Sequence, residues 1–239
     1  MLDIHSHILP GVDDGAADVA AAVSLLEIMK QQGITDVIAT PHFYAMDNNI
    51  DEFEHNVAKA YSDLYAATVG KDLPNVSIGC EVFYFTGIGR STGIRELTLC
   101  RSNHILLELP NCRFDKEILR DITDITDRLG LTVILAHLER YASEKGFKDL
   151  LKLVDNESVL VQINASSLFN PYLKKATLKL INSGYASFLA TDTHSESQRP
   201  PMMSEALEEI KKQFGARVAQ MFVDNSRMLY DEIFRLPIA

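Results

Sequence analysis

The chain lacks the features of a membrane-spanning or exported protein. No run of about 18 apolar residues occurs in it, so no transmembrane helix is expected. Its first seven residues, Met-Leu-Asp-Ile-His-Ser-His, have neither the basic start nor the apolar stretch of a signal peptide. We therefore expect a cytoplasmic protein.

Cysteine and positive charge are also scarce. The three cysteines, Cys80, Cys100 and Cys112, have no paired spacing, which favours reduced thiols over a disulfide framework. Lysine and arginine (23) are outnumbered by aspartate and glutamate (33), which gives a formal net charge of −10. Because nucleic-acid-binding proteins are usually basic, we expect no nucleic-acid partner, whereas an acidic chain can hold divalent cations and act on a phosphorylated substrate.

No linker, internal repeat or shift in composition divides the 239 residues. An apolar fraction of 46% and a charged fraction of 23% are those of a soluble globular protein. The length suits one large core. We predict a single domain over residues 1–239, and the oligomeric state is left open.

Short apolar runs alternate with helical patterns along the chain. The predicted strands are Leu2–His5, Asp36–Thr40, Val76–Cys80, Ile105–Glu108, Thr132–Ala136, Val159–Ile163 and Ser187–Ala190. The predicted helices are Asp18–Gln32, Ile50–Val69, Asp115–Leu129, Phe147–Val154, Pro171–Ser183, Met202–Phe214 and Asp224–Phe234. Asp18 and Asn170 are expected to cap two of these helices, and Gly33 and Gly184 to end them. The alternation predicts an α/β fold with a parallel sheet, as a closed or nearly closed barrel or as an open doubly wound sheet.

Histidines and carboxylates gather where the predicted strands end. The residues at or just after these ends are His5, His7, His42, Glu81, Glu108, His137, Asp192 and His194. Active sites of parallel α/β folds lie at the carboxyl ends of the strands. Residues two apart on an extended segment point the same way, so His5 with His7, and Asp192 with His194, are expected to face one site. Each residue alone is more simply a surface or turn residue; together they predict a metal centre.

Imidazole and carboxylate ligands without cysteine suit Mn, Fe or Zn rather than a structural thiolate site. The set exceeds the needs of one ion, so two or three ions are expected. Paired metals activate water and clamp the oxygens of a phosphoryl transfer. Arg140 and Arg199 lie close in sequence to predicted ligands, and arginine binds phosphate bidentately, although a surface salt bridge is the alternative for each. We predict a metal-dependent phosphate ester hydrolase.

Several motifs resemble those of the PHP superfamily (polymerase and histidinol phosphatase). They are MLDIHSHILPGVDDG at residues 1–15, ATPH at 39–42, GCEVF at 79–83, LELP at 107–110, AHLERY at 136–141, TDTH at 191–194 and RPP at 199–201. They occur in the family's order over most of the chain, and are most similar to bacterial manganese-dependent tyrosine phosphatases of the CpsB/YwqE type. The resemblance implies a distorted (β/α)7 barrel with a three-metal centre at the carboxyl ends of its strands.

The resemblance also implies a role for each site residue. One ion would take His5, His7, Glu81 and Asp192; a second would take Glu81, Glu108 and His137; a third would take Asp14, His42 and His194, with Asp13 as the alternative to Asp14. A hydroxide held between metals would attack phosphorus while Arg140 and Arg199 hold the phosphoryl oxygens. No dedicated general acid is apparent, and a phenolate needs less help to leave than an alkoxide.

The implied substrate is phosphotyrosine on a protein, typically the tail of a bacterial tyrosine autokinase that controls capsule or exopolysaccharide export. The implied metal is Mn²⁺, with Fe or Zn as alternatives. The segments Pro10–Gly11 and Phe43–Asn49 are expected to shape the entrance. The run Phe83-Tyr84-Phe85 is either a buried strand extension, which is favoured, or a surface that stacks on an aromatic ring.

Other functions remain open at this stage. The same metals would serve a small-molecule phosphatase such as histidinol-phosphate phosphatase, or a nuclease or phosphodiesterase of the same superfamily. A metal-binding regulatory module without catalysis is a third possibility, and the complete set of ligands and arginines argues against it. A cysteine-dependent tyrosine phosphatase is disfavoured, because no cysteine has an arginine six residues later.

Overall fold

A computed structural model describes residues 1–235; the last four residues of the predicted domain lie outside the described part. The strands are β1 (Leu2–Ser6), β2 (Asp36–Ala39), β3 (His42–Phe43), β4 (Asn75–Ile78), β5 (Glu81–Phe83), β6 (His104–Glu108), β7 (Thr132–Leu135), β8 (Val159–Asn164) and β9 (Phe188–Ala190). The α-helices are α1 (Val19–Gln31), α2 (Ile50–Thr68), α3 (Lys116–Asp127), α4 (Phe147–Leu151), α5 (Lys174–Asn182), α6 (Met203–Phe214) and α7 (Ala216–Arg235). The 3₁₀ helices are η1 (Ile88–Arg90), η2 (Thr92–Leu97), η3 (Leu99–Arg101), η4 (Leu138–Tyr141) and η5 (Ala165–Leu168).

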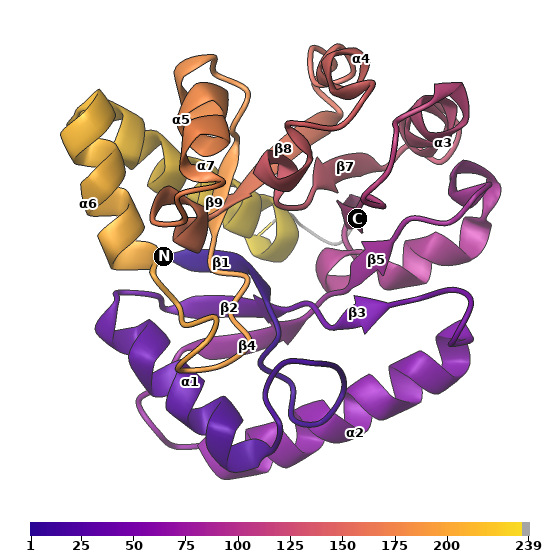
Figure 1. Ribbon diagram of the computed structural model, residues 1–239. Coiled ribbons are helices and arrows are strands. Elements are labelled where there is room, and N and C mark those ends of the chain that lie inside the picture. The colour runs from indigo at the N-terminus through magenta and orange to yellow at the C-terminus, as the bar shows by residue number, and fades with distance from the viewer. Residues whose placement is uncertain (236–239) are drawn as a thin grey trace.

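The strands pair in parallel, as predicted, and form two sheets. One has the order β1-β2-β4 and the other β3-β5-β6-β7-β8-β9. Helices α1 and α2 cover the first sheet, and α3, α4 and α5 lie on the opposite side of the molecule (Figure 1). The parallel α/β prediction is confirmed.

Two short strands, β3 and β5, were not predicted; each follows directly after a predicted strand, Asp36–Thr40 or Val76–Cys80. β2 continues into β3 across Thr40-Pro41, where proline has no backbone N–H to donate to the ladder. β4 continues into β5 across Gly79-Cys80, where a Cβ on Gly79 would lie 2.8 Å from side-chain atoms of both Ile38 and Leu99. Backbone hydrogen bonds from Gly79 N to Ala39 O (2.8 Å) and from Glu81 N to Pro41 O (3.1 Å) carry the pairing across both breaks.

The first and last strands meet and join the two sheets into a ring. Ser6 and Thr193 form a parallel bridge. Asp192 N donates to His5 O (2.8 Å), and His7 N donates to Thr193 O (2.9 Å). Seven strand positions follow one another in this way, two of them occupied by a pair of short strands, β2 with β3 and β4 with β5.

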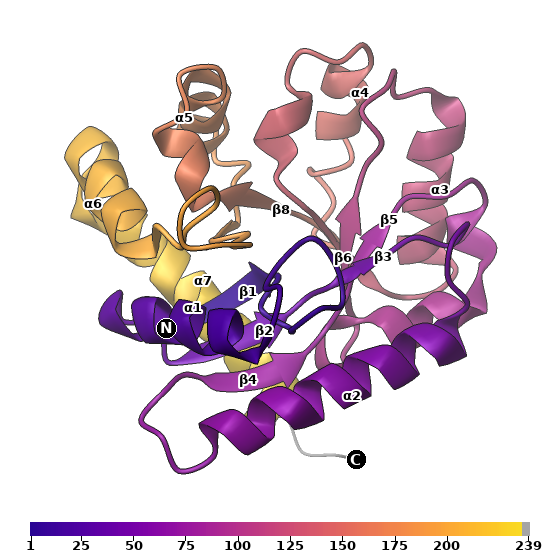
Figure 2. The same ribbon diagram turned by 60° about the horizontal axis from the view of Figure 1, so that its bottom comes forward.

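Apolar side chains fill both faces of the strands. Alternate residues such as Leu106 and Ile134 pack in an inner cluster, which Leu229 of α7 and Leu99 of η3 also enter. Their strand neighbours pack outward in a larger cluster beneath the other helices. Helix α7 contacts β1 and β9, and Figure 2 shows it behind these strands. The inner cluster therefore packs residues from several strands against one another and holds these strands in place.

Helix boundaries follow the predictions with three corrections. Asp18 caps α1 through a hydrogen bond from Ala21 N (2.9 Å), as predicted. Asn170 instead accepts from Tyr172 N in a turn (2.9 Å), so α5 begins only at Lys174. Helix α4 ends at Leu151, earlier than expected, and α7 begins at Ala216 rather than at residue 224. Helix α7 begins earlier than predicted because Ala219 and Phe222 are buried and continue the helical spacing of the later apolar residues.

None of the helices within residues 1–235 combines the length and apolar character that a bilayer crossing requires.

Candidate metal centre

All nine predicted ligands come together at the carboxyl ends of the strands. The loop after β1, which carries Asp14, and the loop after β9, which carries His194, lie close together in Figure 2. Asp14 Oδ1 is 3.3 Å from His194 Nε2. His55 in α2 and His104 at the start of β6, which were not predicted as ligands, are in none of the potential metal-binding groups found among the described residues. His137 and Asp192 are also outside these groups, and each lies beside one of their members, Glu81 and His5 respectively.

His5, His7, Glu81 and Asp192 converge on one point, as the first predicted ligand group. His5 Nε2 lies 3.2 Å from His7 Nε2, 3.2 Å from Glu81 Oε2 and 3.4 Å from Asp192 Oδ1. His7 Nε2 lies 3.2 Å from Glu81 Oε2 and 3.5 Å from Asp192 Oδ1. An ion about 2.1 Å from each ligand keeps neighbouring ligand atoms about 3.0–3.4 Å apart, so this spacing fits a divalent cation.

The second predicted group is also assembled, with Glu81 at its centre. Glu81 Oε1 lies 2.9 Å from His137 Nε2, which is 3.5 Å from Glu108 Oε1. His42 also approaches this group, since its Nδ1 is 3.0 Å from Glu81 Oε2 and 3.6 Å from Glu108 Oε2. Glu81 therefore presents one oxygen to the first group and the other to the second, the arrangement of a bridging carboxylate.

The third group consists of Asp14, His42 and His194. Asp14 Oδ1 is 3.5 Å from His42 Nε2 and 3.3 Å from His194 Nε2. Asp13, the alternative, lies elsewhere: its carboxylate accepts hydrogen bonds from His7 Nδ1 (2.6 Å), Gly15 N (2.9 Å) and His42 N (3.1 Å). The geometry thus favours Asp14 as the ligand and gives Asp13 the role of supporting His7.

Three of the histidines have one ring nitrogen occupied and the other aimed at the cluster. The Nδ1 atoms of His5 and His7 bond to Gln162 Oε1 (3.0 Å) and to Asp13. His194 Nδ1 bonds to the main-chain oxygen of Asp192 (3.0 Å). When Nδ1–H donates, a neutral imidazole keeps its lone pair on Nε2, so each ring is prepared to bind a cation through Nε2.

Several buried atoms that face the cluster have no hydrogen-bond partner within residues 1–235. They are His42 Nδ1, Glu81 Oε2, Asp192 Oδ1 and His194 Nε2; the first two lie 3.0 Å apart without forming a hydrogen bond. Leaving a buried polar atom unpaired costs about 1–3 kcal/mol, so four at one place need an explanation. Imidazole nitrogens and carboxylate oxygens are the donor set that Mn, Fe and Zn accept, and the residues present fit such ions.

Electrostatics within the cluster agree with cation binding. Burial lowers the pKa of His137 to about 4, and burial together with His7 and Arg199 lowers that of His194 to about 4, so both rings are neutral at pH 7. Burial and the charge of Glu81 raise the pKa of Glu108 to about 7. Against the effect of burial, the hydrogen bond with Asp13 and the nearby negative charge of Glu81 raise the pKa of His7 to about 10; a cation bound at Nε2 would take the place of that proton.

Both predicted arginines lie at the edge of the cluster and bind Asp192. Arg140 Nη2 and Arg199 Nη2 donate to Asp192 Oδ2 at 2.5 and 2.6 Å. Their side chains are 33% and 36% exposed, so each guanidinium is anchored at one end and has further N–H donors toward solvent. The structure therefore places both where a phosphate group on the cluster could be reached.

Two of the predicted ligands have a strained backbone. His137, after β7, and Asp192, after β9, have φ angles of 34° and 49°, in the left-handed region that non-glycine residues rarely occupy. Such strain persists only where the surrounding structure imposes it, and it is concentrated at functional sites. His137 N is held by Gln162 Oε1 (2.8 Å) and Asp192 N by His5 O.

The polar residues of β8 that organise the site, Gln162 and Asn164, had no predicted role. Gln162 links His5 to the backbone of His137, and its Nε2 donates to Asn164 Oδ1 (2.8 Å). Asn164 Nδ2 in turn donates to Asp192 Oδ2 (2.5 Å). Their pattern in the sequence could have predicted this role: two polar residues two positions apart at the end of a buried strand point to the same face, here the face of the site.

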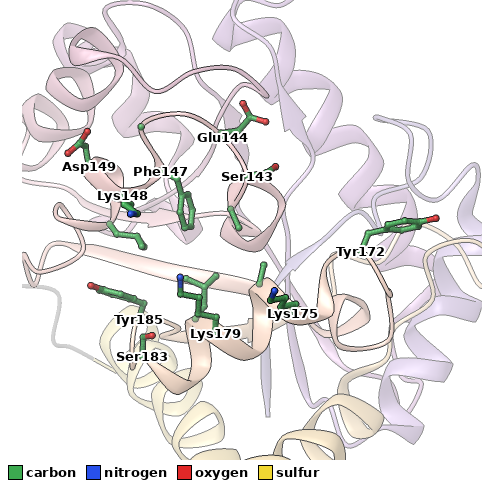
Figure 3. Close-up of a pocket in the computed structure, with 15 residues that line it drawn as sticks. Ser143, Glu144, Phe147, Lys148, Asp149, Tyr172, Lys175, Lys179, Ser183 and Tyr185 are labelled. Atoms are coloured by element: carbon green, nitrogen blue, oxygen red, sulfur yellow. The ribbon is translucent and has the colours of Figure 1, made fainter.

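A groove of about 630 Å³ lies away from the predicted ligands, between α4 and α5. Figure 3 shows Phe147 and Lys148 on one side and Lys175 and Lys179 on the other, with Tyr172 and Tyr185 toward its ends. None of the predicted site residues lines it. Of the residues that line the groove, Ala142 is the nearest in sequence to a predicted site residue, because it directly follows η4, the 3₁₀ helix that contains Arg140.

Comparison with known proteins places this arrangement in a family. The family model described as "Capsular polysaccharide synthesis, CpsB/CapC" matches residues 1–231. The tyrosine-protein phosphatase YwqE of Bacillus subtilis is 30% identical, with 99% of this chain and 95% of YwqE covered. The tyrosine-protein phosphatase CpsB of Streptococcus pneumoniae is 29% identical, with 96% and 98% covered.

A solved structure is similar over nearly the whole chain. It comes from the crystal structures of YwqE from Bacillus subtilis and CpsB from Streptococcus pneumoniae, described as unique metal-dependent tyrosine phosphatases. The TM-score is 0.84 at 28% identity, and the match covers 97% of this chain and 95% of the other. The chain therefore belongs to the CpsB/CapC family of capsular polysaccharide synthesis proteins.

Proposed function

We propose that this protein is a metal-dependent protein-tyrosine phosphatase. The observation that carries the proposal is the convergence of His5, His7, Glu81 and Asp192 on one point, with Glu81 Oε2 and Asp192 Oδ1 buried and without a hydrogen-bond partner in the described part of the chain. Two arginines stand beside that point. The relatives at 29–30% identity carry the same activity in their names.

The proposed metal ligands are His5, His7, Asp14, His42, Glu81, Glu108, His137, Asp192 and His194, in the three groups described above. Two or three ions, with Mn²⁺ preferred over Fe or Zn, suit this set of nitrogens and oxygens. When bound, such ions supply an activated water and stabilise the charge of a phosphoryl transfer. Glu81 holds two groups together and Asp192 holds both arginines in place.

Arg140 and Arg199 are the proposed catalytic residues, because they bind the phosphoryl oxygens as negative charge builds. Each has donors beyond the one that bonds Asp192, and fixed donors need no reorganisation at the transition state. The leaving group of a tyrosine ester has a pKa near 10, so it departs with little protonation. This is consistent with the absence of an evident general acid among the nine ligands and two arginines.

The proposed substrate is a tyrosine-phosphorylated protein, specifically the tail of a bacterial tyrosine kinase that regulates capsule or exopolysaccharide synthesis and export. The family's link to capsular polysaccharide synthesis supports this choice. A cytoplasmic location and a single domain over residues 1–239 belong to the same proposal.

The test is a phosphatase assay on a phosphotyrosine peptide, on histidinol phosphate and on single-stranded DNA, after chelation and then with each metal restored. We expect turnover of the phosphotyrosine peptide, its loss on chelation and its recovery with Mn²⁺. A preference for histidinol phosphate or cleavage of DNA would support the alternative phosphomonoesterase or nuclease.

Arg140→Ala provides the matching variant. Removing one fixed donor to a developing oxyanion costs a factor of about 10²–10³ in kcat, and we expect a loss of that size. Arg128→Ala, which removes an exposed arginine in an ion pair with Asp124, is the control and should keep the wild-type rate. Metal content measured in both variants shows whether the loss arises at the phosphate rather than through displaced ligands. Unchanged turnover in Arg140→Ala contradicts the assigned role.

A further inference from the structure

Two aromatic side chains continue the rows of predicted ligands on β3 and β5. These strands pair in parallel, with His42 opposite Glu81 and Phe43 opposite Val82. The next position along each chain brings Tyr44 and Phe83 together. Because residues two apart on extended chain point to the same face, Tyr44 follows His42, and Phe83 follows Glu81, on the face that holds the cluster.

Ring contacts agree with this placement. The ring centroids of Tyr44 and Phe83 are 5.4 Å apart at an interplanar angle of 47°, and those of Tyr44 and His42 are 5.2 Å apart. Both distances lie within the range of about 4.5–7 Å that packed aromatic rings prefer. Tyr44 and Phe83 therefore form a continuous aromatic wall, whose inner end begins at a predicted ligand.

The wall borders a cavity of about 590 Å³. The cavity is lined by the turn Tyr44–Asp47 and by Phe83–Thr86. Tyr44 and Phe83 are half-buried, and Met46 at the same turn is 92% exposed. The cavity thus has an aromatic side next to the cluster and an apolar residue available at the surface.

The other aromatic residues of this run have different roles. Tyr84 is buried and its hydroxyl donates to Asp121 Oδ2 (2.8 Å) beneath α3. Phe85 packs against the outer apolar cluster. The strand-extension explanation therefore holds for Tyr84 and Phe85, and Phe83 is the member of the run that contacts Tyr44.

Resting on the proposed phosphatase function, we propose that Tyr44 and Phe83 form the subsite for the phenyl ring of phosphotyrosine and set the preference for aryl over alkyl phosphate esters. Neither residue is among the predicted ligands or catalytic arginines. They act by positioning the leaving group.

The spacing explains how the subsite distinguishes the two esters. A step of two residues along a strand is about 6.6 Å, so the wall begins about one phenyl ring beyond the ligand row. A phosphotyrosine whose phosphate lies on the cluster places its ring along the wall. A phosphoserine has a single methylene between ester oxygen and backbone, so its phosphate reaches the cluster only if polar backbone amides lie against the aromatic faces, which is unfavourable.

The kinetic test compares kcat/KM for a phosphotyrosine peptide with that for a phosphoserine peptide of the same sequence. Taking the ratio cancels effects on the shared phosphate site. In Tyr44→Ala and in Phe83→Ala we expect this ratio to fall by about tenfold, the loss of about 1.4 kcal/mol of ring packing in the transition state. Tyr44→Phe keeps the ring and should keep the ratio. Tyr172→Ala removes a tyrosine that is 91% exposed and outside the subsite, and serves as the matched control.

A second test reads binding rather than turnover. The chain contains no tryptophan, so Phe83→Trp introduces the only indole. Titration of the metal-loaded variant with phenylphosphonate should change its fluorescence saturably, whereas methylphosphonate, which has the same anionic group without the ring, should leave it nearly unchanged.

The outcomes separate this inference from the proposed function. If the wild-type protein prefers phosphotyrosine and both alanine variants keep that preference, the subsite is overturned and the phosphatase function stands. If Tyr44→Phe loses as much as Tyr44→Ala, the hydroxyl and not the ring is responsible, which also overturns it. If the wild-type protein hydrolyses neither peptide, the proposed function fails, and equal fluorescence responses to the two phosphonates would independently remove the ring subsite.

Discussion

Asp13 and Asp14 are adjacent in the chain but contact different residues of the site. Asp14 is 65% exposed on its side chain and faces His42 and His194, whereas the Asp13 side chain is 6% exposed. Against the effect of burial, the hydrogen bond with His7 lowers the pKa of Asp13 to about 2. Asp13 therefore stays ionised and fixes the His7 ring so that Nε2 faces the cluster.

Asp13→Asn should weaken metal binding without removing a ligand. An amide has one oxygen, so it cannot accept from His7 and His42 on one side and from Gly15 on the other. Loss of such a supporting hydrogen bond costs about 10–100-fold in metal affinity, and we expect a change of that size in a competition titration against a chelator. Asp149→Asn, at an exposed pair with Lys152, is the control. Equal affinities in the two variants would show that Asp13 does not position His7.

The loop between β1 and α1 is held against the site by a close backbone approach. A Cβ on Gly15 would lie 2.1 Å from the main-chain oxygen of His7 and 2.6 Å from its Cβ. Ala16 N donates to the same oxygen (2.9 Å). This approach returns the loop over His7 and brings both Asp13 and Asp14 to their partners, so a glycine is needed for contact rather than for a left-handed turn.

Gly15→Ala should therefore disturb metal binding and activity together. The clash is with backbone, which cannot move aside as a flexible side chain would, and the loop must lift away from His7. We expect weaker metal affinity and a loss of activity of at least about tenfold, since small displacements at a reacting centre cost up to 10²-fold. Gly33→Ala, where φ is 80° and nothing lies within 4 Å, reports the cost of a glycine substitution distant from the site. It should lower thermal stability slightly and leave activity unchanged.

For the molecule as a whole, the cluster concentrates negative charge. The carboxylates of Glu81, Glu108 and Asp192 meet inside a chain whose formal net charge is −10. Divalent cations at this place would offset the repulsion, and because the site exists only when the strands are assembled, they would bind the folded state in preference to the unfolded chain. We therefore expect folding and metal binding to be coupled.

Removal of metal should lower the melting temperature. A ligand at about 100 times its Kd stabilises a protein by about 2.7 kcal/mol, which for about 240 residues corresponds to roughly 5–10 °C. Differential scanning fluorimetry with a chelator, followed by return of Mn²⁺, Fe²⁺ or Zn²⁺, measures the shift and ranks the metals. Glu81→Gln should show little metal-dependent shift. A chelator-insensitive melting temperature in the wild-type protein would contradict the coupling.

Local pattern accounted for a large part of the architecture. The alternation of apolar runs with amphipathic helices predicted a parallel α/β fold, and the capping of α1 by Asp18 followed from its position before an apolar periodic stretch. The short strands β3 and β5 were missed because they are only two and three residues long, and each resumes after an interruption at Pro41 or Gly79. The start of α7 was missed because the spacing of its first apolar residues predicts a helix only once it is known that these residues are buried.

The sequence by itself determined which residues gather at the candidate site: histidines and carboxylates that follow neighbouring parallel strands lie at one edge of the sheet, because the carboxyl ends of those strands do. Only the tertiary structure decided between Asp13 and Asp14, turned both nitrogens of His42 toward the cluster, and revealed Gln162 as the link between His5 and His137. The link through Gln162 depends on contacts 25 and 157 positions apart in the chain, with His137 and with His5, and Asp14 faces His194 near the other end of the chain. No local pattern encodes such contacts. The left-handed backbone at His137 and Asp192 has the same origin, since neighbouring strands impose it against the local preference of both residues.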